Sequence, residues 1–86
     1  MKRVPLGSLR VSQKGRIVQL KGHVQSIDWV ERLMSMGFLE GSMAEIVHEA
    51  PFGGDPLAIR VRGTLLALRR HEANTIEVIV EESVDE

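Results

Sequence analysis

The residues with the most chemical scope in this chain are its histidines, a pair of arginines and one glycine-rich turn. His23, His48 and His71 stand about 25 residues apart, whereas metal motifs place their ligands at short spacings. The chain has no cysteine, which excludes thiolate ligands, disulfides and thiol catalysis. We therefore expect separate surface histidines, no resident cofactor, and at most weak binding of transition metals.

Arg69 and Arg70 are adjacent, and two guanidinium groups can bind phosphate or act in trans as an arginine finger on a nucleotide hydrolase. The competing interpretation is a solvated face, on which Glu72 and Glu77 balance the charge. Charge runs are usually of that second kind, so we favour it. Regulation of a nucleotide hydrolase through Arg69 or Arg70 remains the alternative.

No other pattern indicates catalysis. Gly53-Gly54-Asp55 is too short for a phosphate loop, and it leads through Pro56 into a strand-like run instead of opening a helix. The serines lack the Gly-x-Ser-x-Gly context of a hydrolase nucleophile. The sequence therefore predicts a protein that is not an enzyme.

Large apolar residues lie at or beside glycine turns, where side chains tend to be exposed. Met36, Phe38, Leu39 and Phe52 form this group. Apolar side chains gathered at loop tips can mark a surface for a protein partner. Alternatively, Met36 and Phe38 fold back over the seam between helix and barrel. By position, Phe38 and Leu39 are the large apolar residues that we most expect to face outward.

Size and composition limit the class of protein. Eighty-six residues predict one domain spanning residues 1–86, in which the acidic stretch 81–86 frays. Eleven basic and twelve acidic residues give a net charge of −1, which argues against nucleic acid as a partner. The sequence shows neither a signal-peptide pattern nor an apolar run of membrane length. We expect a soluble, cytoplasmic protein without direct membrane insertion; self-association remains open.

Hydrophobic periodicity predicts a mainly β protein with one amphipathic helix. Ile27, Val30, Leu33 and Met34 recur at helical spacing, and the helix follows a first strand at 16–21. Either Ser26 or Asp28 can cap it; with Asp28 as the cap, Glu31 completes a capping-box spacing. A left-handed glycine at Gly37 ends it.

Further strands are expected at 43–50, 57–62 and 76–80, with a hairpin to residues 66–68 and one helical turn at 70–74. About five short strands with the helix after the first suggest a small, strongly bent barrel. The residues predicted to make its turns are Gly37, Gly41, Pro51, Gly53, Gly54, Asp55, Pro56 and Gly63.

Three blocks resemble the FeoA family, the ferrous iron transport protein A family. They are Glu31-Arg32-Leu33-Met34-Ser35-Met36-Gly37-Phe38, the turn Ala50-Pro51-Phe52-Gly53-Gly54-Asp55-Pro56, and Leu66-Ala67-Leu68-Arg69-Arg70-His71-Glu72-Ala73. They occur in the family order, and the similarity runs from about residue 6 to residue 80. The resemblance implies an SH3-like barrel and a cytoplasmic accessory role in bacterial ferrous iron uptake.

The resemblance also implies a partner, FeoB, the membrane iron transporter with a cytoplasmic GTPase domain. A related domain at the C-terminus of iron-dependent repressors makes a transition-metal-binding regulatory module the other alternative. The chain departs from the family at Ser12, where glycine is usual, at Glu40, where proline is common, and at His71, where serine is frequent. We expect an adaptor that binds FeoB through Met36, Phe38, Leu39, Phe52, Arg69 and Arg70.

Overall fold

The computed structural model describes residues 2–21 and 27–80, with the side chain of Ile27 excepted. Within them, no helix is long and apolar enough to cross a membrane. The elements, in chain order, are strand β1 (Lys2–Pro5), the 3-10 helix η1 (Leu6–Ser8), β2 (Lys14–Leu20), helix α1 (Ile27–Ser35), β3 (Met43–Glu49), β4 (Leu57–Val61), β5 (Thr64–Leu68), α2 (Arg70–Ala73) and β6 (Ile76–Val80).

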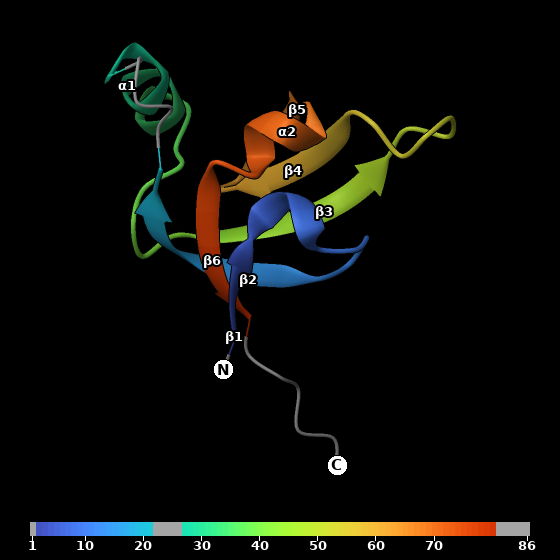
Figure 1. Ribbon diagram of the computed structural model, residues 1–86, viewed down its shortest axis with the longest axis horizontal. Coiled ribbons are helices and arrows are strands. Elements are labelled where there is room, and N and C mark those ends of the chain that lie inside the picture. The colour runs from blue at the N-terminus through green and yellow to red at the C-terminus, as the bar shows by residue number, and fades with distance from the viewer. Residues whose placement is uncertain (1, 22–26, 81–86) are drawn as a thin grey trace.

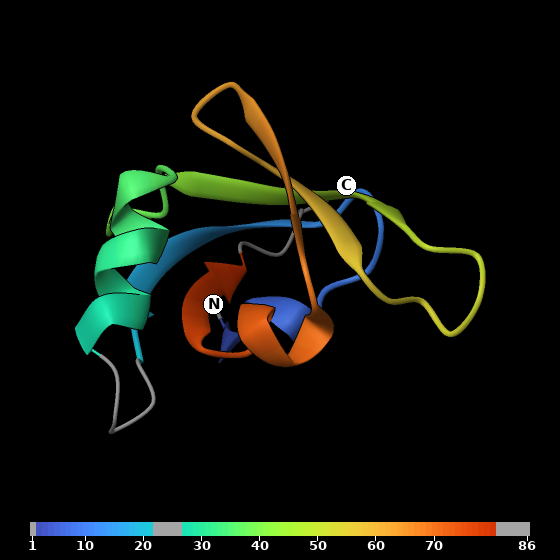
Figure 2. The ribbon, with the colours of Figure 1, turned by 90° about the horizontal axis from the view of Figure 1, so that it is seen from above.

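All six strands form one antiparallel sheet in the order β1-β6-β2-β3-β4-β5. The sheet curls around its own interior, with α2 and η1 side by side at its open side (Figures 1 and 2). Register shifts between Ile17 and Gln19 in β2 and between Ile46 and His48 in β3 bend the strands. Such irregularities increase local twist, and they allow a short sheet to curve into a barrel.

The fold class is as expected, with one more strand than the sequence pattern indicated. The sequence pattern predicted no strand before residue 16, but residues 2–5 pair along β6, from Lys2 opposite Val80 to Pro5 opposite Glu77. Only Val4 in this strand is both apolar and partly buried, so hydrophobic alternation is too weak to reveal it. The pairing depends on β6, which is distant in sequence.

Helix α1 begins earlier than a cap at Asp28 allows, because Ile27 and Asp28 already lie within it. The expectation of Asp28 as the cap is therefore wrong, and Ser26 lies outside the described residues. Leu33 is fully buried, whereas Met34 is 47% exposed. The helical spacing placed Met34 on the same face as Leu33, but Met34 lies outside the buried part of that face.

The core is aliphatic apart from one aromatic ring. Phe38 is the largest of the fully buried side chains, and branched aliphatic residues of the strands surround it. Because α1 stands at one end of the barrel (Figures 1 and 2), it reaches the rest of the fold through few groups. One of these is Trp29, whose Nε1 donates to Thr75 Oγ1 at 2.9 Å. Among the described residues, the buried apolar side chains are Leu6, Leu9, Ile17, Leu33, Phe38, Ala44, Ile46, Leu57, Ile59, Val61, Leu68, Ala73, Ile76 and Val78.

Candidate partner-binding surface

Phe38 faces inward, and the expectation that it faces outward is wrong. Gly37 has a φ of 104°, and its N–H donates to Met34 O at 3.0 Å. The N–H of Phe38 donates to Leu33 O, also at 3.0 Å. These two bonds define a Schellman motif, in which the second residue after the helix packs on the last full turn. Phe38 and Leu33 are accordingly both fully buried.

Met36 and Leu39 flank this motif and are partly buried. Met36 packs against the core cluster, so together with Phe38 it covers the seam between helix and barrel. The alternative of inward packing is therefore the correct one for these two residues. Part of the Leu39 side chain remains exposed, so Leu39 can still contribute a small apolar area to a partner-binding surface.

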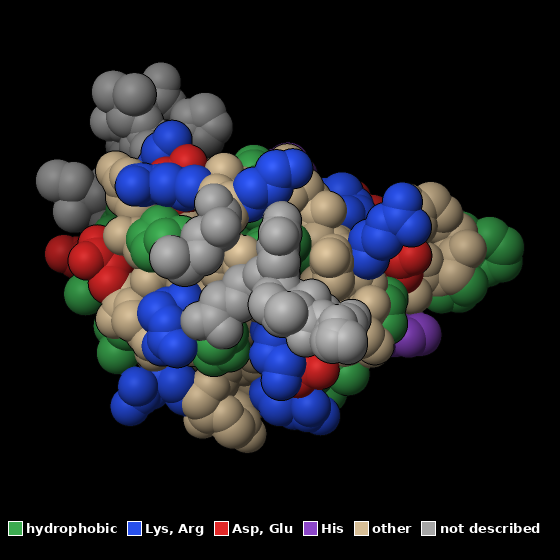
Figure 3. Space-filling model, turned by 90° about the horizontal axis from the view of Figure 1, so that it is seen from below, with side chains coloured by type: hydrophobic (Ala, Val, Ile, Leu, Met, Phe, Trp, Pro, Cys, Tyr) green, Lys and Arg blue, Asp and Glu red, His purple; other side chains and the backbone are tan. Residues whose placement is uncertain are grey.

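Phe52 is the exposed aromatic side chain of the described residues, with 90% of its surface open to solvent. It lies in the turn between β3 and β4, which protrudes from the barrel (Figure 1). In the space-filling view, hydrophobic side chains cover the tip of that protruding end, beyond the arginines and lysines of the neighbouring surface (Figure 3). Exposure of one aromatic ring at a protruding tip is suited to insertion into a pocket of a partner.

The Phe52 turn, defined here as residues 50–56, has a specific backbone conformation. Gly53 and Gly54 have φ values of 79° and 69°, and the Asp55-Pro56 peptide is cis. The N–H of Ala50 donates to Pro56 O at 3.1 Å and closes the base of the turn.

The other glycines that were predicted to make turns also have positive φ values: 104° at Gly37, 92° at Gly41 and 80° at Gly63.

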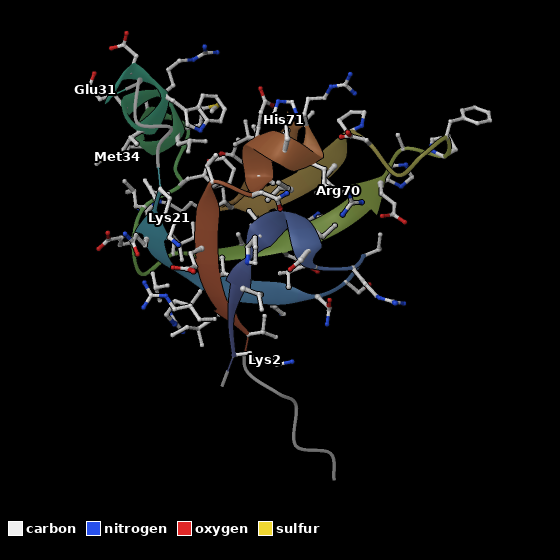
Figure 4. All side chains as sticks on the ribbon, viewed as in Figure 1. Lys2, Lys21, Glu31, Met34, Arg70 and His71 are labelled. Atoms are coloured by element: carbon white, nitrogen blue, oxygen red, sulfur yellow. The ribbon has the colours of Figure 1, made fainter. Side chains whose placement is uncertain are left out.

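Arg70 ties the Phe52 turn to the barrel. Its Nη2 donates to Gly54 O at 2.7 Å and to Glu49 Oε1 at 3.0 Å, while its Nη1 donates to Gly7 O at 2.6 Å. The main-chain N–H of the same residue donates to Asp55 Oδ1 at 2.8 Å. Figure 4 shows Arg70 between α2 and β3, directed toward the base of this turn. The guanidinium is therefore a structural clamp, and we name Arg70, Glu49, Gly54 and Gly7 the Arg70 clamp.

Arg69 differs from its neighbour. Its side chain is exposed, and its guanidinium has no partner among the described residues. Its main-chain N–H donates to Glu72 Oε1 at 2.8 Å, which satisfies the first turn of α2. Arg69 is thus free to contact a partner, whereas Arg70 would have to break several bonds first.

Glu77 does not balance these arginines as expected. Its Oε1 accepts from Arg3 Nε at 2.7 Å, and its Oε2 lies 3.4 Å from Lys21 Nζ. The hydrogen bond from Arg3, helped by the charges of Arg3 and Lys21, lowers the pKa of Glu77 despite some desolvation. Cross-strand pairing of β1 with β6 produces this cluster, and sequence spacing did not reveal it.

Within the described stretches, no group of three or more histidines, aspartates or glutamates is arranged to hold a metal ion. His48 and His71 are exposed, and His71 points away from α2 into solvent (Figure 4). His23 lies outside the described residues.

Two residues with unusual backbone conformation escaped the sequence analysis. Ser12 and Arg62 have φ values of 79° and 50°. Arg62 and Gly63 form the two-residue loop between β4 and β5, and positive φ at both positions is the signature of a type I′ turn. Ser12 precedes β2, at a position where the FeoA family usually has glycine. That departure from the family was the sequence feature that could have indicated a positive φ.

Comparison with known proteins identifies the chain. Residues 4–80 match the FeoA domain family. The FeoA-like protein from Clostridium acetobutylicum is 29% identical with a TM-score of 0.83, over 100% of this chain and 95% of that one. Stenotrophomonas maltophilia FeoA, an SH3 domain protein solved in complex with zinc, is 28% identical with a TM-score of 0.75, over 88% and 87%.

Iron(II) transport protein A from Clostridium thermocellum is 36% identical with a TM-score of 0.79, over 90% of this chain and 45% of that one. No curated protein matches the sequence. The SH3-like fold expected from the three sequence blocks is confirmed by these structures. The chain therefore belongs to the FeoA domain family, the small accessory proteins of ferrous iron transport.

Proposed function

We propose that this protein is a cytoplasmic adaptor that binds the cytoplasmic GTPase part of a FeoB-type ferrous iron transporter and modulates iron uptake without performing bond-making chemistry. The observation that carries the proposal is the Phe52 turn, which presents a 90% exposed ring on a backbone held by the Arg70 clamp. A turn whose backbone is already held in place loses less conformational freedom when its side chain binds a partner. Phe52 is therefore the main anchor, with Arg69 and Leu39 as secondary contacts.

Membership in the FeoA family supports the choice of partner, since these proteins belong to the ferrous iron transport system. The near-neutral net charge of −1 supports a protein partner over nucleic acid. A single exposed apolar side chain surrounded by charged residues is typical of protein interfaces that form and dissociate. Self-association through the same ring is the competing use of this surface.

Regulation of nucleotide hydrolysis is the second candidate, and one observation favours it. Arg69 is exposed and unpaired among the described residues, as an arginine acting in trans must be. Arg70 is excluded from that role while its clamp is intact. Of the two adjacent arginines, Arg69 therefore remains as the candidate finger.

Titration of the purified GTPase domain of the transporter with the protein tests the adaptor proposal. We expect Phe52→Ser to weaken binding about five- to thirty-fold, because a contact centre often contributes 1–2 kcal/mol. Val11→Ser is the matched control, since Val11 is an exposed apolar residue on a different turn. Normal binding by Phe52→Ser, or equal losses in both variants, would remove the Phe52 turn from the interface.

Nucleotide turnover by the same domain separates the two candidates. If the protein is only an adaptor, the GTPase domain should hydrolyse nucleotide at the same rate when bound to Arg69→Gln as when bound to the wild-type protein. If Arg69 acts as an arginine finger, the wild-type protein should accelerate nucleotide hydrolysis by the domain on the order of a thousand-fold. The Arg69→Gln variant should then give no such acceleration.

A further inference from the structure

Strand β5 is an open edge of the sheet. It pairs with β4 alone and ends the strand order. Val61 and Thr64 close the two-residue turn, so Thr64, Leu66 and Leu68 direct their main-chain groups toward β4. By the same alternation, the N–H and C=O groups of Leu65 and Ala67 point away from the sheet, and no described residue pairs with them.

The two edges of the sheet are built differently. The opposite edge, β1, contains Lys2, Arg3 and Pro5, and charged residues and proline are the usual means of preventing edge pairing. Strand β5 reads Thr-Leu-Leu-Ala-Leu and contains neither charge nor proline. Its Leu65 side chain is 57% exposed. One edge is therefore protected against another strand, and the other is not.

Charge at the ends of β5 indicates what fits there. Arg62 precedes the strand at the hairpin turn, and Arg69 follows it; both are exposed. The Nη1 of Arg62 donates one long hydrogen bond, 3.4 Å, to the neutral Ser42 Oγ. Two nearby cations have anionic partners: Arg60, opposite Leu65, lies 3.6 Å from Glu45 Oε1, and Arg70 binds Glu49 Oε1 in the Arg70 clamp. A strand added at this edge would lie between two arginines that have no anionic partner among the described residues.

A second copy of the chain fits this pattern poorly. In an antiparallel pair of β5 strands from two copies, Leu65 and Ala67 of both copies can all form main-chain hydrogen bonds in one register only. In that register Leu65 of each copy lies opposite Ala67 of the other, and the two-fold axis passes through Leu66. That register brings Arg69, which follows one strand, next to the turn residues Arg62 and Gly63 that precede the other. Like charges facing each other across strands oppose pairing.

We propose that the β5 edge binds an extended segment of another protein, apolar over about four residues and flanked by aspartate or glutamate, which adds to the sheet as a seventh strand. Main-chain bonds to Leu65 and Ala67 would supply the pairing, and Arg62 and Arg69 would bind the flanking carboxylates. This interaction goes beyond the adaptor proposal, because it uses main-chain groups of β5 and not the Phe52 turn. It is tested without any transporter.

The probe is the synthetic peptide Glu-Asp-Val-Thr-Val-Leu-Val-Asp-Glu, followed by amide chemical shifts of the labelled protein. We expect saturable shifts at Leu65 and Ala67, with lysine in place of the acidic residues weakening binding more than about ten-fold. Two further peptides carry N-methyl groups on alternate amides, one on each side of the strand. Only one of the two should lose binding, since only one side pairs with β5.

Protein variants complete the test. Arg69→Gln should weaken the acidic peptide about three- to ten-fold, whereas Arg10→Gln, an exposed arginine elsewhere, should leave it within about two-fold. Absence of binding at about 1 mM peptide, equal binding of the lysine-flanked peptide, or equal effects of the two methylated peptides would each overturn the proposal. Concentration-dependent dimerisation that broadens Leu65 and Ala67 would instead assign the edge to a second copy.

Discussion

The main-chain N–H of Phe38 donates to the carbonyl oxygen of Leu33 across 3.0 Å, and both side chains are fully buried. This single relationship fixes how α1 leaves the barrel, because the chain must reverse between the two residues at Gly37. The largest buried side chain of the protein is thus held by a helix-ending motif. Changes at this point act on stability before they act on any partner.

Gly37→Ala should destabilise the fold by about 1–3 kcal/mol, because a side chain at a φ of 104° is strained. Space is not the limit, since an added Cβ meets its nearest atoms, Arg62 Cδ and Val61 Cγ1, at 3.7 and 3.8 Å. Urea unfolding measures the loss. Gly37→Asn is the control and should lose less, because asparagine tolerates positive φ better. Equal midpoints for wild type and Gly37→Ala would contradict the left-handed cap.

Phe38→Ser should lose about 3–5 kcal/mol, the usual cost of truncating a buried aromatic residue. Leu39→Ser, one residue on and only partly buried, should lose much less. Thermal unfolding of the two single variants separates them directly. A Phe38→Ser protein as stable as Leu39→Ser would mean that the ring does not pack on Leu33.

Arg70→Gln should cost about 1–3 kcal/mol and loosen the Phe52 turn, since it removes hydrogen bonds from Gly7, Glu49 and Gly54. Arg69→Gln, which removes the same charge from an exposed side chain, should stay within about 0.5 kcal/mol. Hydrogen exchange of the amides in 50–56 reports the loosening. Similar exchange in both variants would show that the turn does not need the clamp.

Ser12→Gly should stabilise the protein by about 0.5–1 kcal/mol, because a φ of 79° strains serine but not glycine. Ser12→Ala removes the hydroxyl without relieving the backbone, so it should show no gain. The difference between the two midpoints isolates the conformational effect. A gain in both variants would point to the hydroxyl instead.

Acid should abolish the contribution of Glu77. Its pKa is lowered in the folded state by the hydrogen bond from Arg3 and by the charges of Arg3 and Lys21. A carboxyl whose folded pKa is depressed stabilises the fold above its unfolded pKa and loses that effect as pH falls through the folded value. Wild type should therefore exceed Glu77→Gln in thermal midpoint at neutral pH, and the gap should close below the ordinary value of 4.5.

Glu40→Gln controls for the removal of one negative charge, because Glu40 is an exposed carboxylate without a cationic partner among the described residues. The difference in thermal midpoint between wild type and Glu40→Gln should not change with pH in the way that the Glu77→Gln difference does. Added salt should narrow the Glu77 gap at neutral pH, since both partners are exposed.

Local rules explain what was predictable from the sequence. Alternating residues such as Ile76 and Val78, and a glycine turn at Gly63, indicate their own conformations, so β4, β5 and β6 followed from pattern, although Arg62 was expected in the strand and lies in the turn. The inward turn of Phe38 was also within reach, because a glycine that ends a helix implies where the next side chain packs. Exposure near a turn is a weak rule when a helix-ending motif competes with it.

Long-range pairings were not predictable in this way. Strand β1 exists because β6 lies beside it, and Arg70 binds Gly7 across most of the chain length. Neither contact has a local signature: Lys2 and Arg3 belong to no hydrophobic alternation, and nothing in the sequence distinguished Arg70 from Arg69. Residues whose role depends on distant partners require the fold before their chemistry can be assigned.

The central place of β6 has a consequence for synthesis of the chain on the ribosome. It is the last of the six strands in sequence, yet it lies between β1 and β2. A nascent chain that has emerged only as far as Asn74 therefore exposes the unpaired edge of β2 and has no partner for β1. Closure of the barrel therefore requires β6, and until it is available chaperones and proteases can reach an open sheet.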